Sequence, residues 1–220
     1  MGILYIVSTP IGNLSDISLR AIETLQKVDL ILAEDTRKTG TLLKSLKIKK
    51  NLLSFYEHNE LARIPQVIDF LKRGQNLALV SDAGTPTISD PGFKLIREAI
   101  TQGLKIESIP GASAALAALV VSGLPTDKFI FLGYLPKRSG KAIKILKTIA
   151  NLDFTIILFE SPKRLLKNLK LLKDLLGNKS IVVARELTKL HEEYLRGDIE
   201  EIIEHFENNP SRGEITLIIH

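Results

Sequence analysis

The sequence contains no cysteine and no tryptophan, and aromatic residues make up only 5% of its 220 residues. Without cysteine the chain forms no disulfide, offers no thiolate to a metal and has no thiol nucleophile. This composition fits a reducing compartment, and we expect a cytoplasmic protein. Because aromatic residues are so few, Leu, Ile, Val and Ala have to fill the hydrophobic core.

Long apolar runs are also absent. The longest, at 77–80 and 154–159, have the length of a strand, whereas a membrane-spanning helix needs ~18 apolar residues or more. The run that ends before Ser8 has no basic leader, so we interpret it as a first strand and not as a signal peptide. We therefore expect no membrane partner. The four histidines lack the spacing of metal ligands, and we expect no metal site.

What the sequence does have is an ordinary globular composition with an excess of positive charge. Hydrophobic residues make up 45% of the chain and charged residues 25%, and the net charge is +5. A positive net charge favours a polyanionic partner without identifying one.

Strand-length apolar runs alternate with segments of helical periodicity, a pattern typical of a parallel sheet covered by helices. In the first half we predict strands at 3–8, 30–34, 52–55, 77–81 and 105–109, and helices at 18–28, 36–46, 62–73, 91–102 and 112–122. In the second half we predict strands at 129–132, 155–160, 180–185 and 214–219, and helices at 141–150, 162–176 and 199–206. A turn-rich stretch separates the halves, so we predict two α/β domains, 1–122 and 123–220, with a ligand cleft between them.

The sequence VSDAGTPTISDPG, at 80–92, has more glycine, proline and aspartate than a simple turn needs. Residues 82–85 would follow the carboxyl end of a strand, where open α/β sheets bind ligands. Gly84 permits a close approach of the backbone to a ligand. A plain turn remains the alternative for this first part. In the second part, Asp90 and Pro91 have the order of an N-cap followed by the first residue of a helix.

Three further loops follow predicted strands, and their sequences are STPIGNLSDIS at 8–18, AEDTRKT at 33–39 and IPGASAALAAL at 109–119. Loops at the carboxyl ends of parallel strands share one edge of the sheet, so we expect the four loops to converge. Each also has a simpler interpretation. Asp35 or Thr36 fits a helix N-cap, and Glu34 with Arg37 fits an ion pair. The small residues of 112–114 fit a helix packed tightly on the sheet.

Two common phosphate-binding motifs do not fit. No G-x-G-x-x-G occurs, which argues against a standard dinucleotide site. The sequence RSGKA at 138–142 lacks the upstream glycine and the Ser or Thr after lysine that a P-loop requires.

Taken together, the loops resemble those of the tetrapyrrole-methylase superfamily of S-adenosylmethionine-dependent methyltransferases. The motifs that carry the resemblance span nearly the whole chain in family order and are TPIGNL, AEDTR, HNE, VSDAGTPTISDPG, PGASAALAAL followed by SGLP, FES, RELTK and RGE. Within the superfamily, they are similar to those of the enzymes that methylate the ribose 2'-oxygen of a cytidine in the decoding region of 16S rRNA.

The resemblance implies a class III methyltransferase fold, in which two α/β domains hold a folded S-adenosylmethionine in the interdomain cleft. It also implies a homodimer and an acceptor in 16S rRNA or the 30S ribosomal subunit. By position in the motifs, the residues that would contact the methyl donor are Pro10, Asp82, Gly84, Thr85, Ser113, Ala114, Phe159 and Leu187.

A ribose hydroxyl is a poor nucleophile while protonated, so a base or a cationic stabiliser is expected beside it. The sequence does not single out that group. The candidates for catalysis are Glu34, Arg37, His58, Glu186 and Lys189, with Asn13, Asn59 and Arg185 as further candidates on the acceptor side. A loop histidine more often makes a surface hydrogen bond than it acts as a base, and a local ion pair is the alternative for Glu186 with Lys189.

Two basic clusters in the predicted second domain are candidates for RNA contact. The first contains Lys137, Arg138, Lys141, Lys144 and Lys147, and the second contains Lys163, Arg164, Lys167, Lys170 and Lys173. A solvated helix face is the alternative. Two other functions stay open: a small-molecule methylase of the same superfamily, acting on a tetrapyrrole or on diphthamide, and a ribosome-binding factor without catalysis. The basic second domain favours RNA, and the intact donor loops favour an enzyme.

Overall fold

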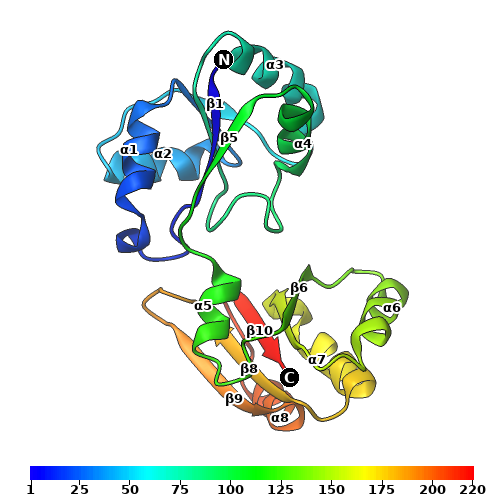
Figure 1. Ribbon diagram of the computed structural model, residues 1–220. Coiled ribbons are helices and arrows are strands. Elements are labelled where there is room, and N and C mark those ends of the chain that lie inside the picture. The colour runs from blue at the N-terminus through cyan, green and yellow to red at the C-terminus, as the bar shows by residue number, and fades with distance from the viewer. The chain divides into compact units, whose positions relative to one another are not determined.

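The computed structural model describes residues 1–220, and the chain divides into two compact units, Met1–Ser113 and Ala114–His220 (Figure 1). The predicted boundary, after residue 122, lies further along the chain. The difference is helix α5 (Ala114–Val120), which contacts β7 (Thr155–Glu160) and β10 (Ile215–Ile219). A helix joins the unit on which it buries its apolar side, so α5 is part of the second unit. No helix of either unit combines the length and the apolar character that crossing a bilayer requires.

The first unit contains a five-stranded sheet in which every pairing is parallel, as predicted, with the order β3-β2-β4-β1-β5. Its strands are β1 (Ile3–Val7), β2 (Leu30–Ala33), β3 (Leu52–Ser54), β4 (Leu77–Val80) and β5 (Lys105–Ile109). Its helices are α1 (Leu19–Lys27), α2 (Thr36–Ser45), α3 (Glu60–Lys72) and α4 (Phe93–Thr101), with a short 3-10 turn, η1 (Leu14–Asp16), that the sequence pattern did not predict.

Two apolar cores cover the two faces of this sheet. Along β4 the side chains alternate, so that Leu77 and Leu79 pack with α3 and α4, whereas Ala78 and Val80 pack with α1 and α2. Figure 1 shows these two pairs of helices on opposite sides of the strands. The chain therefore leaves β1 towards one face and β4 towards the other, although the two strands are neighbours. Such a reversal creates the switch point at which open α/β sheets bind ligands.

The start of α4 differs from the prediction. The N-cap of the helix is Gly92, so Asp90 and Pro91 precede the helix and do not begin it. Gly92 has a φ of 124°, and a Cβ added there would lie 2.6 Å from Leu79 Cδ2. Only glycine permits both the dihedral angle and this close approach to β4. Asp90 is consequently available for the interactions described below.

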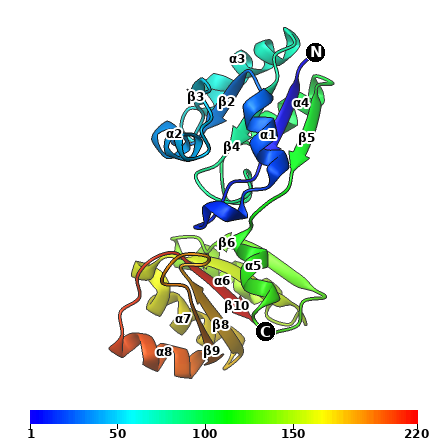
Figure 2. The same ribbon diagram turned by 90° about the vertical axis from the view of Figure 1, so that its left-hand side faces the viewer.

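The second unit contains a mixed five-stranded sheet of order β6-β7-β10-β8-β9, in which only β6 and β7 pair in parallel (Figure 2). Its further strands are β6 (Phe129–Tyr134), β8 (Ser180–Arg185) and β9 (Glu193–Asp198), and its further helices are α6 (Ser139–Ile149), α7 (Pro162–Leu176) and α8 (Ile199–Asn208). The α/β class is as predicted, but the alternation rule fails here because β10 returns from α8 to pair antiparallel between β7 and β8. Strand β9 was not predicted, since an edge strand of sequence EYLRGD has no continuous apolar run.

Candidate functional site

Loops that follow β1, β4 and β5 meet at the carboxyl edge of the first sheet, as expected from a parallel sheet. Thr9 N donates to Gly84 O over 2.9 Å, and Gly84 N donates to Thr9 O over 3.0 Å. These two bonds join the loops after β1 and β4 at the switch point. The Thr85 hydroxyl lies 3.0 Å from the Ser8 hydroxyl and donates to Ala112 O over 3.1 Å. The three loops therefore support one another directly.

Close packing between the loops explains two of their glycines. Gly84 has a φ of 80°, and a Cβ added there would lie 3.4 Å from Ile11 Cγ2. A Cβ added at Gly111 would lie 2.9 Å from the Cβ of Ser8, closer than side chains normally approach. Contact between the loops thus explains why both positions are glycine, whether or not a ligand binds.

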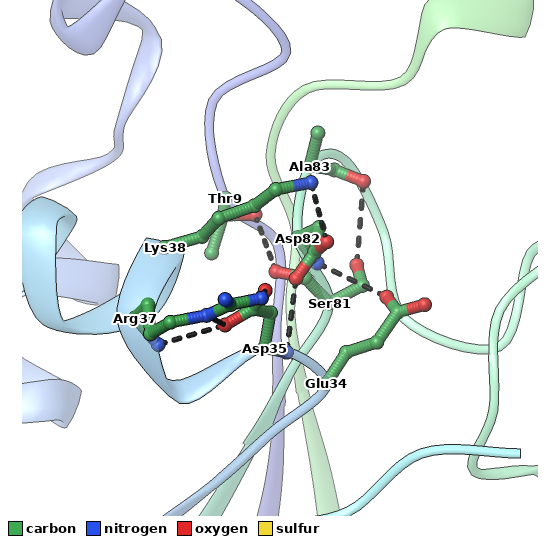
Figure 3. Close-up of polar contacts among 8 residues, drawn as sticks. All are labelled: Thr9, Glu34, Asp35, Arg37, Lys38, Ser81, Asp82 and Ala83. Carbon is green, nitrogen blue, oxygen red and sulfur yellow. Dashed lines mark hydrogen bonds and ion pairs between the residues drawn. The ribbon is translucent and has the colours of Figure 1, made fainter. Parts of the chain in front are cut away.

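Asp82 is the centre of a polar cluster at the same edge (Figure 3). Its Oδ1 accepts the backbone N–H of Asp35 over 3.0 Å, and its Oδ2 accepts Lys38 Nζ over 2.7 Å. Its own backbone N–H donates to Glu34 Oε2 over 3.3 Å. One aspartate therefore links the loop after β4 to the loop after β2. Sequence reasoning missed Lys38, because its partner Asp82 is distant in the sequence.

Arg37 pairs with Asp35 and not with Glu34, the partner considered from the sequence. Arg37 Nη2 lies 2.6 Å from Asp35 Oδ2, and Arg37 Nε lies 3.0 Å from Oδ1. Asp35 also accepts the backbone N–H of Arg37 over 2.9 Å and is the N-cap of α2, as predicted. The hydrogen bonds from Arg37 hold the pKa of Asp35 well below its usual range. Asp35 is thus a structural anion, and Glu34 has no ion-pair partner.

Two carboxyl groups at this edge have raised pKa values. Burial raises the pKa of Glu34, although the hydrogen bond from the Asp82 backbone partly opposes this effect. Burial, together with the negative charge of Glu34, raises the pKa of Asp90 to about 6, and the nearby Ser81 hydroxyl partly offsets the rise. A carboxylate whose pKa approaches neutrality is a better proton acceptor than an ordinary one. Asp90 was not a sequence candidate because its place before Pro91 indicated an N-cap.

A hollow of about 220 Å³ opens beside the Asp82 cluster, between the loop after β1 and helix α2. Its lining includes Pro10 and Asp82, two of the predicted donor residues, with Thr9 and Gly12 beside them. Small-molecule pockets commonly measure ~300–1,000 Å³, so this hollow has room for part of a methyl donor. The predicted donor residues Phe159 and Leu187 belong to the second unit.

In the second unit, Glu186 and Lys189 form the ion pair that was the alternative to a catalytic role. Lys189 Nζ lies 2.9 Å from Glu186 Oε1 and 3.0 Å from Glu214 Oε2. Glu186 Oε1 also accepts the backbone N–H of Glu214 over 2.8 Å. The hydrogen bonds from Glu214 and Lys189 lower the pKa of Glu186, which makes it a poor proton acceptor.

The segment around this ion pair has a strained backbone. Glu186 has a φ of 52° and Thr188 a φ of 63°, values that residues with side chains adopt at a cost of about 1–3 kcal/mol each. The Thr188 hydroxyl is buried without a hydrogen-bond partner. Leu187, a predicted donor residue, is buried between these two positions. Strain of this kind persists where the surrounding structure holds it in place, as the Glu186 carboxylate does here.

The remaining predicted donor residues occupy separate positions. Phe159 lies on β7, where its ring packs edge-on to Phe131 at 4.9 Å and to Tyr134 at 5.8 Å between ring centroids. Ser113 ends the first unit, and Ala114 begins α5 in the second.

The other acceptor-side candidates do not join the Asp82 cluster. His58 is exposed on the loop after β3, and its ring packs edge-on to Tyr56. Asn59 bonds the backbone of Ser54 and Tyr56 in that loop. The remaining two make local contacts: Asn13 caps η1 and Arg185 pairs with Glu193. No group of three or more His, Cys, Asp or Glu side chains is arranged to hold a metal ion.

The two basic clusters of the second unit differ in how many of their cations are neutralised. On α7, Lys170 pairs with Glu207 and Lys173 pairs with Glu200, both carboxylates of α8. These pairs weaken the prediction of an RNA-binding stripe on α7. The exposed α6 lysines that have no ion pair are Lys141, Lys144 and Lys147.

Comparison with known proteins places these features in a family. Residues 3–203 match the family model of the Tetrapyrrole (Corrin/Porphyrin) Methylases. A Thermotoga maritima protein named Ribosomal RNA small subunit methyltransferase I is 48% identical over 219 residues, which cover 100% of this chain and 98% of the relative. A Synechocystis sp. protein of the same name is 49% identical over 220 residues, covering 100% of this chain and 79% of the relative.

Solved structures show the same fold at low sequence identity. A diphthine synthase superposes with a TM-score of 0.77 and 16% identity, covering 99% of this chain and 90% of that one. The methyltransferase CobJ gives a TM-score of 0.75 and 17% identity, covering 100% and 94%. A uroporphyrin-III C-methyl transferase from Thermus thermophilus, complexed with S-adenyl homocysteine, gives 0.70 and 17%, covering 99% and 97%.

Proposed function

Since the chain belongs to the tetrapyrrole (corrin/porphyrin) methylase family, we propose that it transfers a methyl group from S-adenosylmethionine to the ribose 2'-oxygen of a cytidine in 16S rRNA. The observation that carries this proposal is the similarity over the whole chain, at 48–49% identity, to relatives named Ribosomal RNA small subunit methyltransferase I. The convergence of the motif-bearing loops at a switch point supports it. The solved structures, at 16–17% identity, support the fold alone.

In the proposed reaction the acceptor oxygen forms a bond to the methyl carbon while the carbon–sulfur bond breaks, which leaves a thioether. The hydroxyl proton passes to a base. The sulfonium donor brings its own reactivity, so the protein has to bind both substrates, align them and manage the proton. This displacement needs no metal.

We assign proton acceptance to Glu34 among the predicted catalytic candidates. Burial raises its pKa, and the backbone N–H of Asp82 orients its carboxylate at 3.3 Å. Glu186 has a lowered pKa and is held by Lys189, so we assign it to support the segment that contains Leu187. Arg37 holds Asp35 at the start of α2. We assign the contacts with the methyl donor to the main chain of residues 82–85, to Pro10 and to the other predicted donor residues.

The proposed acceptor is the 30S subunit or its 16S rRNA, contacted through exposed lysines of α6. Their positions at i, i+3 and i+6 put them along one side of that helix. Phosphate neutralisation by lysine makes RNA binding fall with salt. A homodimer and a cytoplasmic location remain proposals that the family resemblance supports.

The decisive experiment is methyl transfer from labelled S-adenosylmethionine to 30S subunits that lack their own methylation, with free 16S rRNA in parallel. Label on a ribose 2'-oxygen is the expected result. A Glu34→Gln variant should keep donor binding by calorimetry and lose turnover, which separates proton acceptance from binding. Donor binding with no labelled RNA would favour a small-molecule acceptor. If the protein neither binds the donor nor labels RNA, the result would favour a factor without catalysis.

A further inference from the structure

A basic groove lies in the first unit, away from the loops that carry the family motifs. It has a volume of about 770 Å³ and lies between the C-terminal end of α2 and the segment that leads into β3. Strand β3 and α2 contact each other and lie side by side in Figure 2. Four lysines line the groove, and they are Lys44, Lys47, Lys49 and Lys50.

The charge of this groove is almost uncompensated. Asp29 is its one acidic residue, and its Oδ2 already accepts the backbone N–H of Asn76 over 2.7 Å. Lys44, Lys47 and Lys49 are exposed and make no side-chain hydrogen bond or ion pair. Elsewhere in the first unit several lysines have carboxylate partners, and these are Lys27, Lys38, Lys94 and Lys105. Lys50 donates to Val28 O over 2.6 Å, so three of the four groove lysines have no internal partner.

The backbone at Lys47 provides a second, independent observation. Helix α2 ends with Ile48 N donating to Leu43 O over 2.8 Å, and Lys47 has a φ of 57°. Glycine is the usual residue at this left-handed position after a helix. A lysine there is less favourable than glycine, because its Cβ crowds the following carbonyl oxygen. The chain therefore keeps a cation at a position where glycine would stabilise the fold.

We infer that this groove binds the sugar-phosphate backbone of RNA that flanks the methylated nucleotide, an inference that rests on the proposed function. Lysine is a point charge that suits phosphates without demanding a fixed geometry. The apolar floor, formed by Leu43, Ile48 and Leu52, has no aromatic ring on which a base would stack. Contact through phosphates alone positions RNA without reading its sequence.

The position of the groove relative to the Asp82 cluster fits such a role. Gly40, Leu43 and Lys44 line the groove, whereas Thr41, Leu42 and Ser45 line the hollow beside Asp82. The two sets lie on opposite sides of α2, because the helix turns 3.6 residues per turn. Groove contacts are therefore remote from methyl transfer. They should strengthen RNA binding and lower KM without changing kcat.

The test compares two triple variants with equal change in net charge. The groove variant is Lys44→Gln with Lys47→Gly and Lys49→Gln. The control is Lys27→Gln with Lys72→Gln and Lys105→Gln, whose lysines are exposed, lie in the same unit and already bond Glu23, Gln102 and Glu107. Binding to a 16S rRNA fragment is measured against salt, with donor affinity and thermal unfolding alongside.

We expect the groove variant to lose RNA affinity and the control to match wild type, with donor binding unchanged in both. Between about 50 and 200 mM salt, wild-type affinity should fall roughly 20- to 40-fold more than that of the groove variant, since three phosphate contacts are gone. The single variant Lys47→Gly should unfold at a temperature no lower than wild type and should still bind RNA more weakly. That result would exclude damage to the fold as the cause of the weaker binding.

Equal losses in the groove variant and the control would overturn the inference in favour of net charge alone. If the groove variant bound free RNA as wild type does but had a raised KM on 30S subunits, the groove would instead be assigned to contact with a ribosomal protein. Wild type that binds the fragment but labels no RNA would contradict the proposed function, while the groove comparison would still be decided by the binding data.

Discussion

The Asp82 cluster of the first unit and the Glu186 corner of the second use carboxylates in opposite ways. In the first, Glu34 and Asp90 are half-buried with few cations nearby, and their pKa values are raised. In the second, Glu186 accepts hydrogen bonds from Lys189 and from the Glu214 backbone, and its pKa is lowered. The same residue type thus has a raised pKa in one place and a lowered pKa, with a role in holding a loop, in the other.

The difference follows from what surrounds each group. The first cluster forms where loops end a parallel sheet, so several acidic side chains share one edge with Lys38 as the cation bonded to Asp82. The Glu186 corner forms where β10 pairs antiparallel with β8, and the backbone N–H of Glu214 at that junction points at the carboxylate. In these two sites, sheet topology therefore determines whether a carboxylate lies beside other acidic side chains or beside hydrogen-bond donors.

The largest effect is expected from Asp82→Ala. The substitution leaves the Asp35 N–H and the Lys38 ammonium without their acceptor. Losing a hydrogen bond to a charged group costs about 1.5–3 kcal/mol, so we expect the free energy of unfolding to fall by about 2 kcal/mol. S-adenosylmethionine affinity should fall at least tenfold because the predicted donor loop after β4 loses its link to the loop after β2. Urea denaturation and calorimetry measure the two effects.

Asp82→Asn is the matched control, since it keeps an oxygen for the Asp35 N–H and loses the charge that pairs with Lys38. Its stability and its affinity for S-adenosylmethionine should lie between those of wild type and the alanine variant. An alanine variant with wild-type stability and donor affinity would show that the cluster does not organise the loops.

Gly213→Ala tests the other side of the comparison. Gly213 has a φ of 82°, and an added Cβ would clash with Glu186 Oε1. The alanine has to strain its backbone and displace the carboxylate, and we expect a loss of about 2 kcal/mol in the free energy of unfolding. Gly140→Ala, where no atom lies within 4 Å, should leave stability unchanged or slightly higher. Equal stability of both variants would mean that the Glu186 corner is not tightly packed.

Much of the first unit is predictable from sequence because its signals are local. Parallel strands buried on both faces are apolar throughout, as in β4, and their order along the chain places their loops on one edge. Caps such as Ser18 for α1 and Asp35 for α2 are also local signals. The second sheet is less predictable, since β9 is an edge strand and β10 pairs with strands distant in the chain.

The candidate site is predictable only in part. Motif spacing indicates Asp82 and Glu34, but which acid pairs with Arg37 depends on side-chain geometry that spacing does not determine. Asp90 is free to lie near Glu34 because α4 begins only after Gly92, where the close approach to Leu79 requires glycine. Contacts between segments distant in sequence decide these roles, and a single sequence does not encode them as a local pattern.

Asp90→Asn should raise stability at neutral pH. The pKa of Asp90 is raised to about 6 in the folded chain, above its ordinary value of 3.8, so the folded state binds the proton more tightly. The stability that this proton contributes is fully present below about pH 4 and is lost as the pH rises to about 6. The variant removes this loss and should be more stable than wild type at pH 7 by about 1 kcal/mol, after allowance for solvent screening.

The measurement is urea denaturation at several pH values, with exposed Asp174→Asn as the control. The gain from Asp90→Asn should disappear towards pH 4, where the wild-type group is protonated. A gain that is the same at every pH would assign the effect to packing and not to charge.

Glu186→Gln should have the smallest effect. The amide keeps an oxygen for the Glu214 N–H and loses only the charge that pairs with Lys189. That ion pair is partly exposed, so we expect a loss below about 1 kcal/mol in the free energy of unfolding. Because the pKa of Glu186 is lowered, its contribution is present above the ordinary value of 4.5 and is lost as the pH falls through the folded value. The stabilities of wild type and variant should therefore become equal in acid, as they do for Asp90→Asn. At pH 7 the difference has the opposite sign, because Glu186→Gln is less stable than wild type. If Glu186→Gln instead abolished methyl transfer while stability and donor affinity stayed near wild type, the carboxylate at this corner would be a catalytic group, and the contrast between the two sites would fail.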